Sequence, residues 1–408
     1  MRIRQRVAGR GVEAEDGDES VERALASPNP TLTFYDIDEV GRNFFYRDWD
    51  MESLEFVYQA RASRVVFGEG SLNHLEGEVL ALNAERALVI CSPEQKDTGA
   101  YIAQRLGQRC AGLFDRAVMH VPIELAREAL AVVHHLNADC AVVVGGGSAI
   151  GLGKAIALES ELPILAIPTT YSGSEMTPIF GITEASLKRT GTDIKVLPKT
   201  VIYDPTLTTT LPVGLSVTSG INAIAHAAEG LYARDSNPVT SMMAEEGISA
   251  LAEALPAIVA NPSDVAARSK ALYGSWLCGI VLGSVGMALH HKLCHTVGGS
   301  FNLPHAPTHT IILPHALAYN RNASPEAMKR IARALKAEDA ATGMHEFARK
   351  VGAPLSLKDI GMRQDDLDRA ADIAASNPYW NPQPVDREKI RRLLQDAFDG
   401  VQPRTWAL

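Results

Sequence analysis

Residues 139–159 read DCAVVVGGGSAIGLGKAIALE, and this stretch decides the predicted fold. Ala141–Val144 is a short β-branched run typical of a buried strand, and three glycines and a serine follow it directly. The remaining residues, AIGLGKAIALE, favour a helix. Strand, glycine loop and helix in succession predict an anion cradle, because glycine lets the backbone approach a phosphate and the helix presents free N–H groups. The glycines follow neither the Walker nor the GxGxxG spacing, so a tight structural turn is the alternative interpretation.

The same alternation of strands and helices extends on both sides of this stretch. Short apolar runs such as RALVICS at 86–92 are separated by helix-length segments such as IELAREALAVVHHLN at 123–137. This order predicts a parallel sheet covered by helices. From residue 213 the β-branched runs stop, and Ala/Leu/Glu-rich segments of helical period continue to the end. We therefore predict a Rossmann-like α/β domain over residues 51–212 and an all-α domain over residues 213–408.

The first 50 residues fit neither domain. They begin with MRIRQRVAGRGVEAEDGDESVE, a charged stretch without an apolar period, which predicts a disordered extension. Met51 opens the first strand-like segment and is an alternative start of the protein. Charged residues stand where a signal peptide needs its apolar region, and no apolar run approaches the roughly 20 residues that span a bilayer.

Composition excludes several classes of function. A chain of 408 residues with 46% hydrophobic and 21% charged residues is typical of a globular protein of two domains. A net charge of -9 argues against a general nucleic-acid or anionic-membrane surface, since either would favour a basic face. The five cysteines are widely spread and form no CxxC pair, which fits a reducing cytoplasm without disulfides.

A second ligand-binding segment, PTTYSGSEMTP at 168–178, follows another predicted strand and is dense in hydroxyl groups. Its hydroxyls and amides suit a phosphate or a nicotinamide, although a serine- and threonine-rich loop that caps a helix has the same composition. Together with the glycine loop it favours a dinucleotide. The candidate cofactor residues are Gly145, Gly146, Gly147, Ser148, Thr169, Thr170 and Ser174.

Histidines concentrate in the predicted helical domain. His291 and His295 lie one helical turn apart in ALHHKLCHTVGGSFNLPHAPTH, and His305 follows after a Gly-Gly break. So many imidazoles in one segment predict a functional cluster, within which we interpret His290 and His309 as structural.

A metal is one reading of these histidines. Asn222 and His226 share one helix face in SGINAIAHAAEG, so His226 can join the cluster. Three neutral imidazoles and a carboxylate would suit a divalent ion, but Asn222 is a neutral amide. Glu229, three residues after His226, is interpreted as a solvated or ion-paired residue. We therefore expect no metal.

The order of these motifs, GGGS, PTTxxGSE, GxNAxxH and HxxxHxxGxxxxxPH, resembles the iron-containing alcohol dehydrogenase family over roughly residues 55–400. The long strings GGGSAIGLGKA, TSGINAIAHA and MALHHKLCHTVGGSFNLPHA resemble the branch of that family that reduces maleylacetate. The resemblance implies a dinucleotide cleft between an α/β and a helical domain, usually in a homodimer.

The resemblance also assigns residues. In the metal-dependent relatives an aspartate and three histidines hold the ion, at the places of Asn222, His226, His291 and His305. The asparagine departs from that set, and Gly151 departs from the aspartate that usually follows GGGS. Both departures are shared with the branch that reduces maleylacetate, and Lys188 matches a family position near the cofactor.

The implied reaction is the NADH- or NADPH-dependent reduction of the C=C bond of maleylacetate, or of chlorinated analogues, to 3-oxoadipate in aromatic degradation. Hydride addition to an enone leaves an enolate, which needs an oxyanion donor and a proton. We expect His295 to be the leading acid or oxyanion donor, with His291 and His305 shaping the pocket and His226 supporting it, and the sequence leaves the order among them open. Lys292 and Asn222 are the candidate substrate-binding residues.

Three other functions stay open at this stage. They are a metal-dependent alcohol dehydrogenase that tolerates Asn222, a dehydroquinate-synthase-like lyase, and a dinucleotide sensor without catalysis. Ser92 stands where the relatives often carry an aspartate that binds the NAD ribose, so the sequence leaves NADH and NADPH open. No nucleic acid or membrane partner is expected.

Overall fold

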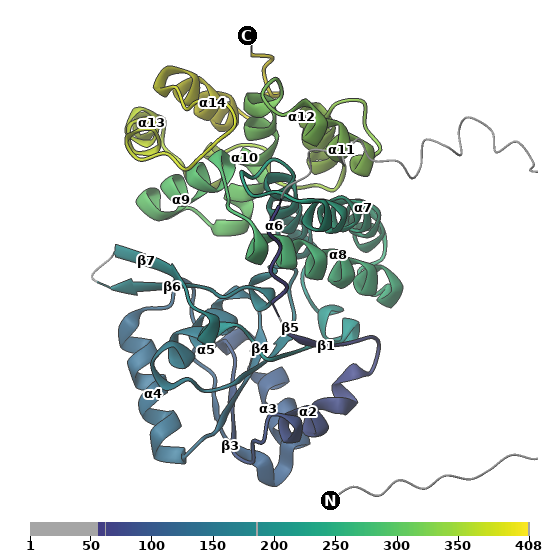
Figure 1. Ribbon diagram of the computed structural model, residues 1–408, viewed down its shortest axis with the longest axis vertical. Helices are drawn as coiled ribbons and strands as arrows, with labels where there is room; N and C mark the ends of the chain where they lie inside the picture. Colours follow the sequence, from purple (N-terminus) through teal and green to yellow (C-terminus); the bar gives the residue numbers. More distant parts are fainter. Residues whose placement is uncertain (1–55, 62, 185–186, 407–408) are drawn as a thin grey trace, which may run out of the picture. The chain divides into compact units, whose positions relative to one another are not determined.

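A six-stranded parallel sheet forms the first half of the described chain (Figure 1). The computed structural model describes residues 56–406 except 62 and 185–186, so the expectations for residues 1–50 and Met51 lie outside the described residues. All neighbouring strands run parallel, as predicted. Their order across the sheet is β1 (Arg64–Phe67), β8 (Thr200–Tyr203), β5 (Ile164–Pro168), β4 (Cys140–Gly145), β2 (Ala87–Ile90) and β3 (Cys110–Phe114).

Helices cover both faces of this sheet, which is why its central strands are apolar throughout. In β4, Val142 and Val144 belong to a core with α2 (Leu75–Ala81) and α3 (Lys96–Leu106). Ala141 and Val143 point the other way, into a core shared with α4 (Ile123–Leu136) and α5 (Gly147–Ser160). This period of two is the expected alternation of a strand buried on both faces.

An antiparallel hairpin, which the sequence analysis did not anticipate, lies outside the parallel sheet. It consists of β6 (Ile179–Glu184) and β7 (Leu187–Thr192), and Thr183 pairs with Lys188. Short 3₁₀ turns connect the elements of this half: η2 (Ser71–His74), η3 (Pro93–Gln95), η4 (Gly107–Arg109), η5 (Ser174–Met176), η6 (Ile194–Val196) and η7 (Pro205–Thr208).

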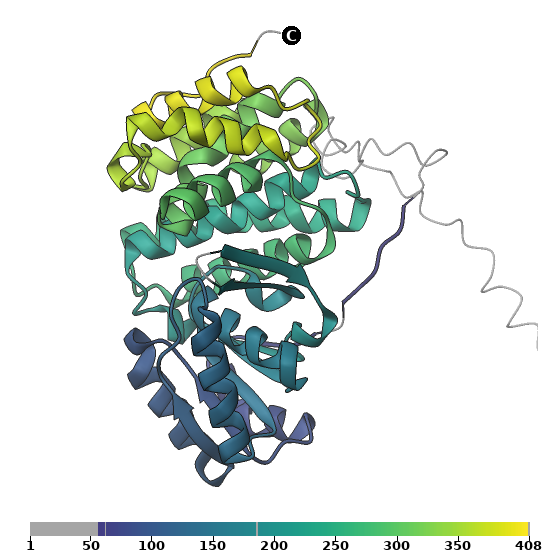
Figure 2. The same cartoon turned by 90° about the vertical axis from the view of Figure 1, so that its left-hand side faces the viewer.

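From residue 213 to 406 the described chain contains helices and no strand, as predicted. The turned view of Figure 2 shows them packed side by side. They are α6 (Val213–Leu231), α7 (Pro238–Ala260), α8 (Val265–Ser284), α9 (Leu289–Phe301), α10 (His305–Asn320), α11 (Pro325–Leu335), α12 (Ala340–Lys350), α13 (Leu367–Ser376) and α14 (Arg387–Asp399), with turns η8 (Lys358–Ile360) and η9 (Gln364–Asp366). α6 is the central helix of this half, because every residue from Ser216 to Leu231 is buried.

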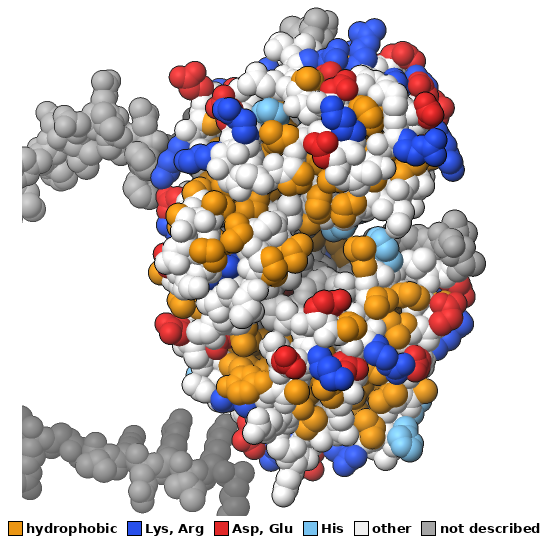
Figure 3. Space-filling model, turned by 180° about the vertical axis from the view of Figure 1, so that it is seen from behind, with side chains coloured by type: hydrophobic (Ala, Val, Ile, Leu, Met, Phe, Trp, Pro, Cys, Tyr) orange, Lys and Arg blue, Asp and Glu red, His pale blue; other side chains and the backbone are white. Residues whose placement is uncertain are grey.

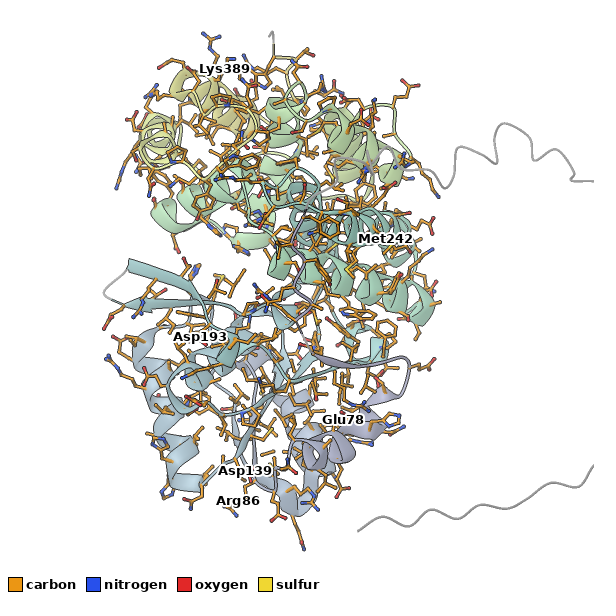
Figure 4. The ribbon with its side chains drawn as sticks, viewed as in Figure 1. Glu78, Arg86, Asp139, Asp193, Met242 and Lys389 are labelled. Carbon is orange, nitrogen blue, oxygen red and sulfur yellow. The ribbon has the colours of Figure 1, made fainter. Side chains whose placement is uncertain are left out.

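The amino-terminal ends of the strands carry a polar network far from any candidate site residue. Asp139, labelled with Arg86 in Figure 4, accepts the backbone N–H groups of Glu85 and Arg86 at 2.9 and 2.8 Å. The Arg86 guanidinium in turn donates to the Leu136 carbonyl at 2.7 Å. These bonds fix the loop after α4, so this end of the sheet is structural.

The face in Figure 3 carries Lys and Arg side chains interspersed with Asp and Glu, and no single sign dominates it. In the described chain no single helix has the length and hydropathy to cross a membrane. The bent pair α8 and α9, which meet at 95°, passes that test by composition alone.

Candidate active site

The glycine loop after β4 forms an open helix amino terminus. β4 ends at Gly145, α5 begins at Gly147, and no side chain caps the helix at Gly146. A Cβ on residue 146 would lie 2.8 Å from Thr170 Cγ2, so glycine is what allows this close approach. The first N–H groups of a helix have no acceptor within it, and the helix dipole favours an anion beside them. The loop therefore has the chemistry of a pyrophosphate site.

The first turn of α5 also explains one departure from the family pattern. A Cβ on Gly151 would lie 2.9 Å from Val121 Cγ2. Val121 itself has a φ of 43°, which is unfavourable for a β-branched side chain, and its carbonyl accepts the Thr183 N–H at 3.0 Å. An aspartate at position 151 therefore has no room unless Val121 moves.

The hydroxyl loop, residues 169–178, lies against the glycine loop. Thr169 N–H donates to the Gly145 carbonyl at 3.2 Å. The hydroxyl oxygens of Thr169 and Ser172 are buried and have no hydrogen-bond partner among the described residues. Buried hydroxyls normally have a partner, so these two are available to a ligand that enters the loop.

A buried lysine that the sequence analysis overlooked holds the hydroxyl loop in place. Lys154, on α5, donates to the carbonyls of Ser174 and Ile179 at 2.7 and 2.8 Å and to Thr177 Oγ1 at 3.0 Å. Burial lowers the pKa of Lys154 to about 7, although the nearby Glu175 carboxylate opposes this shift. The sequence signal for this role was a lysine in the middle of an apolar helix, because a buried lysine requires hydrogen-bond acceptors around it.

The hydroxyl loop meets the helical half through small residues. A Cβ on Gly173 would lie 3.0 Å from the Cα of Gly279 on α8 and 3.7 Å from His226 Nδ1. The loop is thereby held beside the first histidine of the cluster. Lys188 lies on β7 opposite Thr183, and its side chain is outside the described atoms.

Six imidazoles from three helices form what we call the histidine cluster: His226 on α6, His290, His291 and His295 on α9, and His305 and His309 on α10 (Figure 1). The ring centres of His226 and His291 are 5.1 Å apart, and those of His291 and His309 are 5.0 Å apart. His295 and His305 lie on the exposed side of the cluster, and the others are buried. The four histidines predicted from sequence therefore do converge.

Glu229 organises this cluster from a position that is completely buried. Its carboxylate accepts the backbone N–H groups of Ala288 and His290 at 2.9 and 2.7 Å, at the start of α9, and it pairs with His291 Nδ1 at 2.6 Å. Burial alone would raise the pKa of Glu229, but the hydrogen bond from His291 and the neighbouring imidazoles bring it below its usual value. The interpretation of Glu229 as a solvated surface residue was wrong, and its ion pair is an internal one.

Burial keeps the inner imidazoles neutral. It lowers the pKa of His290 to about 4, and with the surrounding imidazoles it places the pKa values of His226 and His309 well below the usual range. His290 Nε2 donates to the His309 carbonyl at 3.0 Å, which fits the structural role expected for it.

His309, in contrast, lies in the middle of the cluster. Its ring centre is 4.2 Å from that of His305, and neither of its ring nitrogens has a partner in the described part of the chain. The sequence signal for this position was the spacing of four residues between His305 and His309, which places both side chains on one helix face.

His295, one of the two exposed histidines of the cluster, is paired with a tyrosine from the loop after α13. His295 Nδ1 and the Tyr379 hydroxyl are 3.1 Å apart, and Lys292 Nζ lies 5.6 Å from the centre of the Tyr379 ring. Burial, reinforced by the negative charge of Glu229, raises the pKa of Tyr379, so the phenol stays protonated. Burial also lowers the pKa of Lys292. The sequence analysis missed Tyr379, since nothing in NPYWNP links it to a helix 80 residues earlier.

The loop that carries Tyr379 is anchored to the end of α10. The side-chain amides of Asn381 and Asn320 exchange two hydrogen bonds of 2.7 and 2.9 Å. Asn381 Oδ1 also accepts the Leu289 N–H at 3.3 Å, at the start of α9. Tyr379 is thus positioned against α9 by a buried polar link.

The four residues at the family's metal positions differ from the relatives' ligand set in one place, where Asn222 replaces the charged aspartate. Asn222 Oδ1, His226 Nδ1 and His291 Nε2 are buried without partners in the described chain, as ligand atoms would be. However, the set contains no carboxylate, and Glu229 is already occupied by His291 and by the start of α9. In the described ranges, another group of three histidines brings its ring nitrogens within 4.8 Å of one another. These are His290, His291 and His309.

Both halves of the chain match one family. Residues 62–205 match the family described as "Iron-containing alcohol dehydrogenase". Residues 216–398 match the one described as "Fe-containing alcohol dehydrogenase family, C-terminal". The chain belongs to the iron-containing alcohol dehydrogenase family, a family of oxidoreductases.

Individual relatives narrow the comparison. The chain is similar to maleylacetate reductase of Burkholderia cepacia, with 59% identity over 348 residues, which are 85% of this chain and 99% of that protein. The crystal structure of maleylacetate reductase from Agrobacterium tumefaciens superposes with a TM-score of 0.83 at 50% identity, covering 86% of this chain and 100% of that one. A structure from Ralstonia eutropha JMP134, named provisionally as an alcohol dehydrogenase, is 64% identical with a TM-score of 0.85 over the same shares.

Proposed function

We propose that this chain is a maleylacetate reductase that transfers hydride from NADH or NADPH to the C=C bond of maleylacetate or a chlorinated analogue. The observation that carries the proposal is the similarity to curated maleylacetate reductases, which reaches 59% identity and spans nearly their whole length. The His295–Tyr379 pair beside a cluster of neutral imidazoles supports it chemically.

The dinucleotide would lie on the glycine and hydroxyl loops. Its pyrophosphate would take the amides of Gly146, Gly147 and Ser148 at the start of α5, next to Gly145. Thr169, Thr170 and Ser174 would bind the nicotinamide side, because the hydroxyl loop extends from the glycine loop to His226. Lys188 is proposed near the cofactor on its position in the hairpin alone.

The reaction asks the protein to handle one oxyanion and one proton. When bound, the nicotinamide would supply hydride to the carbon β to the ketone, which leaves an enolate on the ketone oxygen. The protonated phenol of Tyr379 would donate its hydrogen bond to that oxygen, and His295 Nδ1–H, 3.1 Å away, would donate to the phenol oxygen. A proton from this pair to the carbon next to the ketone completes 3-oxoadipate, and solvent at the exposed His295 replaces it.

The remaining histidines would define the pocket. His305 would form its exposed wall, while His291 is held by Glu229 and His226 lies behind it. Maleylacetate carries two carboxylates, and Lys292, partly buried next to Tyr379, is the cation placed to bind one of them. Asn222 would offer its amide to the substrate side of the pocket.

Catalysis is proposed to need no metal ion. The β-carbon of an enone is already electron-poor, so hydride addition does not require the Lewis acid that alcohol oxidation at neutral pH favours. The neutral Asn222 supports this, because it stands where the metal-dependent relatives carry a charged aspartate ligand.

Oxidation of NADH by the purified protein with maleylacetate, run with and without a chelator, tests this function. We expect turnover in both runs, and His295→Ala should lower kcat by about 10² to 10⁴-fold without weakening NADH binding. Loss of activity on chelation with recovery on adding iron or zinc would instead favour a metal-dependent alcohol dehydrogenase.

Tyr379→Phe isolates the proposed oxyanion donor. Removing one such donor costs about 10² to 10³-fold in kcat, so a loss of this order is expected. Tyr101→Phe is the matched control, because this exposed tyrosine on α3 lies outside both candidate loops. A Tyr379→Phe variant as active as Tyr101→Phe would remove Tyr379 from the mechanism.

Three further proposals concern the whole protein. The α/β and helical domains divide at residues 212 and 213, in the connection between η7 and α6. The protein is cytoplasmic, since its five cysteines suit a reducing compartment. It assembles as a homodimer, as its family resemblance implies.

A further inference from the structure

Three imidazoles of the histidine cluster form a compact set that the proposed reaction does not use as a unit. Within the described chain, one ring nitrogen from each of His290, His291 and His309 lies within 4.8 Å of the other two. All three residues are at most 4% exposed. His290 and His309 are absent from the family's metal positions, so this set shares only His291 with the one that the resemblance implies.

The ring nitrogens of this set are available for a ligand. His291 gives its Nδ1 to Glu229, and its Nε2 has no partner among the described residues. Neither ring nitrogen of His309 has a hydrogen-bond partner in the described part of the chain. His290 uses Nε2 to reach the His309 carbonyl, which leaves Nδ1 as its acceptor nitrogen, 3.4 Å from His291 Nδ1.

The surroundings also suit a cation. Histidines that bind metals usually donate their second nitrogen to a carboxylate, which fixes the ring and raises its basicity, and Glu229 makes this contact with His291 at 2.6 Å. Glu229 also supplies one full negative charge in a completely buried position. Zn²⁺ binds imidazole nitrogen at about 2.0–2.1 Å, so the three rings need to close by a small rotation, for which His309 has no side-chain hydrogen bond to break.

The set borders the exposed side of the cluster. His305 is exposed, and its ring centre is 4.2 Å from that of His309. His295, also exposed, lies with its ring centre 5.9 Å from that of His291. The buried set therefore lies one ring away from exposed imidazoles.

We propose that His290, His291 and His309 form a binding site for Zn²⁺ or a similar borderline divalent cation, and that occupation of this site inhibits the enzyme. The binding site follows from the geometry alone, while the inhibition rests on the proposed function. A bound ion takes His291 away from the pocket and fixes His309 beside His305. Zinc is then an inhibitor of an enzyme whose catalysis needs no metal.

Binding is measured first without substrate, so that it does not depend on the proposed reaction. Titration of the chelator-treated protein with Zn²⁺ by calorimetry is expected to show one tight site, and Co²⁺ in its place should give the intense visible bands of a tetrahedral ion. His309→Gln is expected to weaken binding by at least about 100-fold, the upper end of what loss of an outer-shell partner alone costs. His315→Gln is the matched control, because His315 is a buried histidine on the same helix outside the set.

Location and inhibition are then tested separately. Anomalous diffraction from wild-type crystals soaked in Zn²⁺ needs no variant to fold, and a peak bounded by His290, His291 and His309 is expected. A peak bounded instead by Asn222, His226 and His305, or binding unaffected by His309→Gln, would overturn the site. Maleylacetate turnover that stays constant while Zn²⁺ binds would overturn the inhibition, whereas zinc binding by a protein without this turnover would leave the site standing and refute the function.

Discussion

Replacing Glu229 by glutamine should destabilise the protein far more than a change of one carboxylate to an amide usually does. The carboxylate is completely buried and accepts the N–H groups of Ala288 and His290 as well as His291 Nδ1. An amide keeps one acceptor oxygen but turns an NH₂ group toward at least one of these donors. Each buried donor left without an acceptor costs roughly 1–3 kcal/mol, and breaking a buried ion pair costs about 3–5 kcal/mol. We expect a loss of about 3–5 kcal/mol.

The effect should depend on pH in a defined direction. The pKa of Glu229 in the folded protein lies below the ordinary value of 4.5, so its ionised form stabilises the fold at neutral pH. This stabilisation is lost as the pH falls from 4.5 through the lower folded pKa. Because glutamine does not titrate, the gap in stability between wild type and Glu229→Gln should narrow in acid.

Urea unfolding followed by circular dichroism, at pH 7 and in steps down to pH 3, measures both effects. Glu253→Gln is the control, since this surface carboxylate pairs with the exposed Lys270 and Lys336, and its substitution should cost about 1 kcal/mol or less. Equal midpoints for the Glu229 and Glu253 variants, or a gap that does not change with pH, would refute the role assigned to Glu229.

Three further predictions concern other parts of the fold. Gly146→Val should weaken NADH binding at least about tenfold, roughly 1.4 kcal/mol, because its Cβ would lie 2.8 Å from Thr170 Cγ2; unchanged affinity in a fluorescence titration would count against the cradle. Asp139→Ala should lower stability by about 1–2 kcal/mol in thermal unfolding but leave kcat unchanged, because its two backbone hydrogen bonds lie at the opposite end of the strands. His290 stays neutral to a pKa of about 4, whereas an unfolded histidine takes up a proton near 6.5, so stability should fall by about 3 kcal/mol between these pH values through this group alone. A His290→Gln variant should lack that share of the acid loss, and an unchanged acid profile would contradict it.

The fold was predictable from sequence because its signals are local. The β-branched runs with helices between them predicted the parallel sheet, and their end at residue 213 predicted the helical half. The hairpin of β6 and β7 escaped prediction, since neither of its strands, IFGITE and LKRTGT, has the regular apolar–polar alternation of a half-buried strand. Its pairing depends on neighbours that only the folded chain supplies.

The site was predictable where its residues are close in sequence. Within α9 a spacing of four residues places His291 and His295 on one face, and the helix break before His305 returns the chain to them. Contacts between distant segments were beyond the sequence. Tyr379 reaches His295 across 84 residues, and Glu229 reaches His291 across 62, which no periodicity encodes.

The contact between Gly151 and Val121 has a consequence for how this protein can change over generations. A single substitution that restores an acidic side chain at position 151 places its Cβ 2.9 Å from a methyl group on a branched, conformationally restricted residue. Replacing Val121 by glycine first removes both that methyl group and the positive φ of a β-branched residue. The order of mutations therefore matters: an acidic group at position 151 meets less strain when position 121 changes first, whereas the direct step requires Val121 to shift.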